Sequence, residues 1–95
     1  MRWSVNLAAE GDRPVTHDEV VELADAVARW GGVASGIGMP RYGASVIVEA
    51  ATRDEAVEAG RRLFASAVQT AGLPPWPVMD ASAIGEDEDE LGYLE

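Results

Sequence analysis

The stretch from Ala44 to Gly72 constrains the fold most, because it has the pattern of a strand that leads directly into a capped helix. Apolar and polar residues alternate from Ala44 to Ala50, which is the two-residue period of a strand with one buried face. Thr52 stands three residues before Glu55, and this spacing predicts a capping box at the start of the helix. Apolar residues then recur at helical spacing until Gly72, a residue type that commonly ends helices.

The first third of the chain repeats this pattern in outline. Trp3, Val5 and Leu7 alternate with polar residues, which predicts a strand from residue 2 to residue 9. Thr16 and Glu19 have the spacing of a second capping box, and the helix that they begin should end at Gly31-Gly32.

The remaining segments complete a symmetric order of elements. Residues 33–38 form a weak strand pattern that glycines interrupt, residues 39–43 are typical of a hairpin connection, and residues 78–84 alternate as a fourth strand. The order strand, helix, strand, strand, helix, strand predicts an α+β fold, namely a ferredoxin-like βαββαβ plait with a four-stranded antiparallel sheet and both helices on one face. We therefore expect one domain over residues 1–84 and an acidic tail over residues 85–95.

The composition excludes several classes of protein. The chain has 95 residues, 47% of them apolar, and no cysteine, which leaves enough material for one core but excludes disulfides and thiolate metal sites. The start of the sequence lacks the apolar run of a signal peptide, and nowhere do about 20 apolar residues follow one another as in a membrane span. These features predict a soluble cytoplasmic protein that does not bind membranes.

The charge is strongly negative but unevenly distributed. Seventeen acids against seven arginines give a net charge of -10, and six of the acids fall within the last ten residues. The rest of the chain is only mildly acidic and shows no cluster of cations. Since affinity for nucleic acid comes mainly from neutralised phosphates, we expect no nucleic-acid partner.

The polar side of the predicted sheet is the first candidate binding surface. If Trp3, Val5, Leu7, Val46 and Val48 face the helices, the other side carries Arg2, Ser4, Asn6, Ser45, Ile47 and Glu49. This mixed surface is either solvated, or a subunit interface, or the floor of a ligand cavity. Two-fold dimers are the commonest oligomers, so we expect a homodimer, with Asn6 and Glu49 as candidate binding residues.

The glycine-containing segment from Gly36 to Gly43 is a second candidate. It is not a dinucleotide-binding loop, because Arg41 stands where the third glycine is required and a strand rather than a helix follows. We interpret it as a flexible hairpin. Arg41 and Tyr42 at its tip would form a contact pair for a partner, an anion or an aromatic ligand.

Residues with catalytic or metal-binding chemistry are scarce. His17 is the only histidine, it lies beside the predicted start of the first helix, and no cysteine is available to complete a metal site. A nucleophile motif of the Gly-x-Ser-x-Gly kind does not occur. We expect no catalytic residue, no metal and no cofactor.

The C-terminal segment is the least ordinary part of the sequence. Five consecutive acids, Glu86 to Glu90, favour disorder and are typical of interaction tails. Leu91 and Tyr93 follow them as apolar anchors. Two interpretations stay open: the segment from Glu86 to Glu95 docks on a basic, partly apolar groove of another protein, or Leu91 and Tyr93 fold back onto this domain or its dimer mate.

These observations leave competing functional hypotheses. The first is a noncatalytic, dimeric protein-interaction module that binds a partner through its hairpin loop, its acidic tail, or both. The alternative is a small cofactor-independent enzyme, similar to a monooxygenase or isomerase of the dimeric α+β barrel type, with a cavity lined by Asn6, Tyr42, Trp76 and Asp80. A third hypothesis, a mimic of nucleic acid, fits less well because the acids are collected in the tail.

Overall fold

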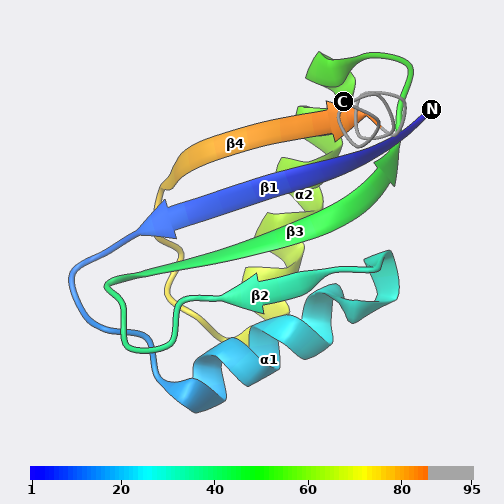
Figure 1. The fold of residues 1–95 in the computed structure, drawn as a ribbon. Helices are drawn as coiled ribbons and strands as arrows, with labels where there is room; N and C mark the ends of the chain where they lie inside the picture. Colours follow the sequence, from blue (N-terminus) through cyan, green and yellow to red (C-terminus); the bar gives the residue numbers. More distant parts are fainter. Residues whose placement is uncertain (86–95) are drawn as a thin grey trace, which may run out of the picture.

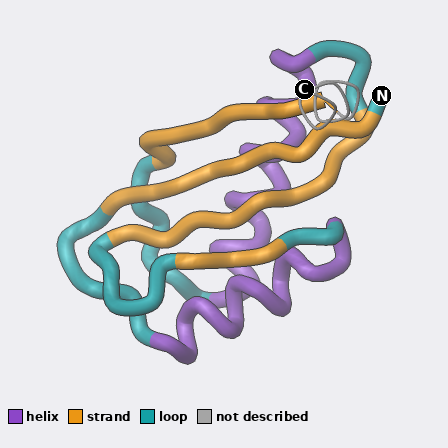
Figure 2. Tube along the Cα trace, viewed as in Figure 1, coloured by secondary structure: helices purple, strands orange, loops and turns teal. Residues whose placement is uncertain are grey.

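An antiparallel sheet of four strands with two helices accounts for residues 1–85, the part of the chain that the computed structural model describes (Figure 1). The elements follow in the predicted order: β1 (Arg2–Glu10), α1 (His17–Val27) with a 3₁₀ turn η1 (Ala28–Trp30), β2 (Val33–Ser35), β3 (Arg41–Glu49), α2 (Arg53–Ala71) and β4 (Val78–Gly85). Across the sheet the strands lie in the order β2-β3-β1-β4, and every neighbouring pair is antiparallel. In Figure 2, α2 passes behind the strands and α1 lies below β2, and buried residues of both helices join the same core.

The predicted capping residues begin both helices, but only the first forms a complete capping box. The Thr16 hydroxyl accepts from the backbone N–H of Glu19 at 3.2 Å, and the Glu19 carboxylate accepts from the N–H of Thr16 at 2.9 Å. At α2 the Thr52 hydroxyl accepts from the N–H of Glu55, whereas the Glu55 carboxylate accepts from the N–H of Ala51 at 3.3 Å. The reciprocal bond predicted at α2 is therefore displaced by one residue.

The helices end where the sequence predicts. Gly31 ends η1 and Gly72 ends α2, both with left-handed backbone angles, at φ 64° and 75°. The N–H of Gly72 donates to the carbonyl of Gln69, and that of Leu73 donates to the carbonyl of Val68, so the last turn of α2 is satisfied.

The second strand is shorter than predicted. β2 stops at Ser35, and the next residues leave the sheet to pair with the segment before α1. The N–H of Gly38 donates to the carbonyl of Val15, and the N–H of Val15 donates to the carbonyl of Met39, each at 2.9 Å. The prediction of a strand to residue 38 is wrong because these residues bond with the chain around Val15 rather than with β3.

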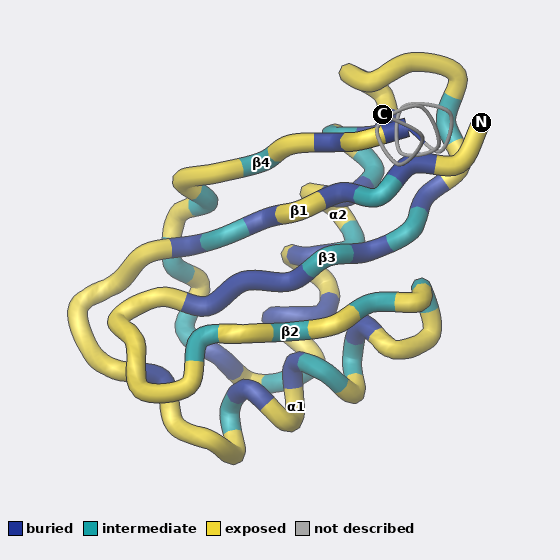
Figure 3. Tube along the Cα trace, in the orientation of Figure 1, coloured by how far each residue is buried: buried dark blue, intermediate teal, exposed yellow. Residues whose placement is uncertain are grey.

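The core lies between the sheet and the helices. Buried positions alternate with intermediate or exposed ones along β1 and along β3 from Ala44 onward, whereas the start of β3 is buried without interruption from residue 42 to residue 44 (Figure 3). The five residues predicted to face the helices are all buried, namely Trp3, Val5, Leu7, Val46 and Val48. α2 approaches β1 closely at Gly60, where a Cβ atom would lie 2.5 Å from Cγ1 of Val5. The small residues of the helices thus permit close contact between the layers.

The predictions for the C-terminal segment fall at or beyond the end of residues 1–85. Gly85, which the sequence assigned to the tail, is the last residue of β4 and pairs with Trp3. The candidates Leu91 and Tyr93 lie outside the described residues.

None of the helices within residues 1–85 is long and apolar enough to cross a membrane.

Candidate functional site: the open face of the sheet

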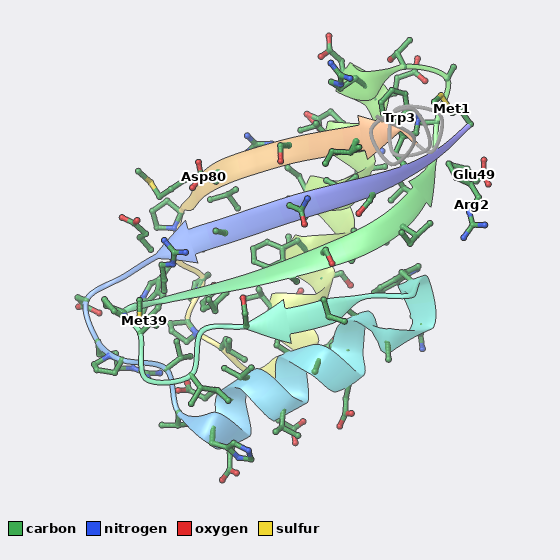
Figure 4. The ribbon with its side chains drawn as sticks, in the orientation of Figure 1. Met1, Arg2, Trp3, Met39, Glu49 and Asp80 are labelled. Atoms are coloured by element: carbon green, nitrogen blue, oxygen red, sulfur yellow. The ribbon has the colours of Figure 1, made fainter. Side chains whose placement is uncertain are left out.

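The side of the sheet that the helices leave uncovered is called here the open face, and it faces the viewer in Figure 4. Strand alternation places on it Arg2, Ser4, Asn6, Ala8 and Glu10 of β1, and Arg41, Gly43, Ser45, Ile47 and Glu49 of β3. Their cross-strand neighbours add Val33 and Ser35 of β2, and Asp80, Ser82 and Ile84 of β4. The predicted polar side of the sheet is confirmed in position, and a binding role for Asn6 and Glu49 stays a prediction.

The register arranges the centre of the open face in three rows across the strands. The first row is Ile47, Ser4 and Ile84; the second is Val33, Ser45, Asn6 and Ser82; the third is Ser35, Gly43, Ala8 and Asp80. Asp80 is the only charged member, and it lies on β4 at the edge of the sheet. Apart from Asp80, the centre is therefore uncharged and partly apolar.

Charged residues occupy both ends of the two central strands. Arg2 pairs in register with Glu49 at one end, and Glu10 pairs with Arg41 at the other. The carboxylate of Glu49 lies 3.6 Å from the N-terminal amine of Met1, close to Arg2 in Figure 4. Within residues 1–85, Arg2, Glu10 and Arg41 form no ion pair.

A hollow of about 400 Å³ lies over the third row. Its floor is formed where Gly43 stands beside Ala8, because neither residue has a side chain long enough to fill the space. A Cβ atom on Gly43 would lie 3.0 Å from the carbonyl oxygen of Leu7, so there is little room for a side chain at this position. The walls come from Asn6, Val33, Ser35, Met39, Arg41 and Ser45.

The walls of the hollow combine unused polar groups with exposed apolar ones. Among the described residues, the side chains of Asn6, Ser35, Ser45 and Arg41 have no hydrogen-bond partner, although each can donate. Val33 is 67% exposed and Met39 is 49% exposed. The hollow therefore offers hydrogen bonds and apolar contact in one place.

Tyr42 does not lie at a loop tip with Arg41, and this prediction is wrong. β3 begins at Arg41, so the two side chains point to opposite faces of the sheet. The ring of Tyr42 is buried against the helix side, its hydroxyl donates to the carbonyl of Pro74 at 2.6 Å, and burial raises the pKa of the phenol. Of these two residues, only Arg41 extends its side chain onto the open face.

The four residues proposed to line an enzyme cavity are divided between the two faces. Trp76 stacks on Tyr42 with 5.4 Å between ring centroids, and Arg13 lies over the indole ring at 5.8 Å. Asn6 and Asp80 are on the open face. Within one copy of the chain the four do not surround a common cavity, since only Asn6 and Tyr42 contribute to the lining of one hollow.

His17 is exposed, as predicted, and its Nδ1 atom lies 3.7 Å from the carboxylate of Asp18. In the part of the chain that the structure describes, no three residues with acidic or imidazole side chains are placed to hold a metal ion together.

Elsewhere on the molecule, away from the open face, one ion pair strongly lowers the pKa of a carboxylate. The guanidinium of Arg13 binds both oxygens of Glu19, at 2.6 and 2.9 Å, and the N–H of Thr16 donates to the same carboxylate. Mainly through the bond from Arg13, the pKa of Glu19 falls to about 2, and that of Arg13 rises. This pair anchors the loop before α1 and does not contribute to the hollow.

Sequence reasoning missed Val33, Ser35 and Gly43 as parts of the site. Val33 and Ser35 alternate correctly for the open face, but the glycines that follow weakened the strand prediction. The depression at Gly43 depends on the register that brings Ala8 beside it.

Comparison with protein families, curated proteins and solved structures found no match for this chain.

Proposed function

We propose that the protein is a noncatalytic interaction module that self-associates and binds protein through its open face and the β2–β3 hairpin. The observation that carries this proposal is the hollow, where Arg41 and Asn6 have no partner among residues 1–85 and Met39 and Val33 are exposed. Arginine and methionine are enriched in protein interfaces, and a partly apolar surface with free donors suits such contact. The acidic segment Glu86–Glu95 would add a contact for a basic partner.

The proposal includes a cytoplasmic location and a ferredoxin-like plait as the scaffold. Counted from the other edge, the strand order is β4-β1-β3-β2, and a face free of helices is what such a plait would present to a partner. The net charge of -10 supports a protein partner over a nucleic acid, because phosphate backbones are bound by clustered cations.

A photo-crosslinking amino acid at position 6 tests the proposal in the cells that produce the protein. We expect one reproducible protein adduct from this position, with mass spectrometry identifying either a second copy or another protein. The same crosslinker at Glu22, an exposed residue of α1, is the matched control and should give no specific adduct. Equal adducts from both positions, or none from either, would contradict an interaction role of the open face.

The alternative is the small cofactor-independent enzyme of the monooxygenase or isomerase kind. Its support is the volume of the hollow, about 400 Å³, which lies in the range of about 300–1,000 Å³ common for ligand sites. A small aromatic compound that raises the melting temperature of the wild type, and not of an Asn6→Ala variant, would favour this function.

A further inference from the structure

We propose that the partner of the open face is a second copy of this chain, packed face to face about a two-fold axis across the strands. The axis lies between the two sheets, perpendicular to the strands, and passes at the middle row near Ser45 and Asn6. It therefore places β1 over the partner's β1 and β3 over the partner's β3, each pair antiparallel. This inference rests on the function proposed above and specifies both the partner and its orientation. It is supported by the charges at the strand ends and by the shape of the centre.

The charges match under this rotation. Arg2 and Glu10 lie on β1 at equal distances from Asn6, so the rotation places Arg2 opposite the partner's Glu10. Arg41 and Glu49 lie on β3 at equal distances from Ser45, so Arg41 comes opposite the partner's Glu49. Each arginine thus meets a carboxylate, and the two-fold axis repeats every contact. Aligned sheets cross at about 30°, an offset that these long side chains can span.

The shapes match as well. Ile47 lies two residues from Ser45 in one direction and Gly43 two residues in the other, so the rotation seats Ile47 over the partner's Gly43. That position is the floor of the hollow. Ser4 meets the partner's Ala8 in the same way. Asp80 comes opposite the partner's Ile84, at the edge strand where the carboxylate can remain in water.

A two-fold axis parallel to the strands fits less well. It also pairs Arg41 with a glutamate, the partner's Glu10, but it places Gly43 over the partner's Ala8. Two hollows would then face each other and leave an unfilled space, which loses the packing contacts of a close interface. The position of Ile47 relative to the hollow therefore selects the axis across the strands.

The area of the open face suits a weak but specific dimer. Three strands of eight or nine residues and the three-residue β2, at about 3.3 Å per residue and about 4.8 Å between strands, present about 460 Å² per copy. The total of about 900 Å² lies in the range of weak and transient interfaces. We therefore expect monomer and dimer to exchange, with the equilibrium sensitive to single charges.

Charge exchange between Arg41 and Glu49 tests the orientation by sedimentation equilibrium on the full chain. Arg41→Glu and Glu49→Arg should each raise the dimer Kd on the order of tenfold, because each places like charges together twice. An equimolar mixture of the two variants should form a heterodimer with near wild-type affinity, and the double variant should recover its homodimer. Recovery also shows that the single variants are folded, and circular dichroism checks this independently.

A third variant tests the seating of Ile47. Ile47→Ala should raise the dimer Kd about tenfold, while Val21→Ala, which removes a similar side chain from the exposed face of α1, should leave it unchanged. Equal effects of the two variants would overturn the proposed packing.

Other outcomes separate this inference from the proposed function. A wild type that remains at the 10.1 kDa mass of one chain up to about 1 mM would overturn the dimer, because affinities weaker than this carry no specific assembly. A crosslink from position 6 to a different protein would then still support the interaction module. If the double variant Arg41→Glu/Glu10→Arg regained the wild-type dimer affinity and Arg41→Glu/Glu49→Arg did not, the axis across the strands would be overturned.

Discussion

At the scale of single residues, the ion pair of Arg13 with Glu19 joins a turn to the first helix. The same carboxylate serves the capping box of α1 through the N–H of Thr16, so one side chain organises both the loop and the helix start. Its pKa lies near 2 instead of its ordinary value of 4.5, because donors from Arg13 and Thr16 favour the ionised form.

This shift predicts the direction of a pH effect on stability. A lowered pKa in the folded state means that the contribution of Glu19 is complete above pH 4.5 and is lost as the pH falls from 4.5 towards 2. Glu19→Gln keeps a side chain that can cap but removes the charge. We expect it to lower the urea midpoint at pH 7 and to differ from the wild type much less at pH 2. Glu22→Gln, on the exposed side of α1, is the control and should change the midpoint little at either pH.

At the scale of elements, the distance between α2 and β1 is set by a residue without a side chain. A Cβ atom at Gly60 would lie 2.5 Å from Cγ1 and 2.9 Å from Cβ of Val5, and Val5 is fully buried. Contacts that short do not occur between real atoms, so helix or sheet would have to move.

Gly60→Ala is therefore expected to destabilise the protein although alanine is the better helix former. Overpacking costs about 1–3 kcal/mol, while the gain in helix propensity is about 1 kcal/mol. Urea denaturation should show a net loss of up to about 2 kcal/mol. In a Val5→Ala background the same change should cost less, because the shortened side chain leaves room for the new methyl group. A stabilised Gly60→Ala variant would contradict the close approach.

At the scale of the whole molecule, the sheet divides two tasks between its faces. One face joins the helices in a single core that includes Tyr42 and Phe64, and the other carries the hollow and the charged strand ends. The core lies entirely between the sheet and the helices, so we expect that substitutions on the open face can alter association without altering folding.

The acidic segment beyond Gly85 gives a prediction at this scale. Removal of residues 86–95 eliminates six acids and changes the net charge from -10 to -4, so two copies repel each other less. We expect an unchanged circular dichroism spectrum and a dimer Kd lowered several-fold at low salt, together with loss of binding to a basic partner protein. A control chain with Glu86–Glu90 replaced by serines keeps the length and should also dimerise more tightly. A weaker dimer on truncation would instead assign the segment a direct role in self-association.

Most predictions made from short-range patterns are confirmed by the structure, although the capping box at α2 is displaced by one residue. The order of elements, both threonine caps and the glycine ends of the helices depend on residues within a few positions of each other. Errors arose where a distant segment competes for the same groups. The pairing of residues 36–39 with Val15 ended β2 early, and the start of β3 at Arg41 turned Tyr42 into the core.

The sequence by itself thus determined which segments become strands and helices, and which side of each is apolar, because periodicity and capping are local properties of the chain. Only the tertiary structure decided the candidate site. Its hollow requires Gly43 beside Ala8, and its charged ends require Arg2 beside Glu49 and Arg41 beside Glu10. Those neighbours are distant along the chain, and strand register, which depends on the packing of the whole sheet against its helices, brings them together.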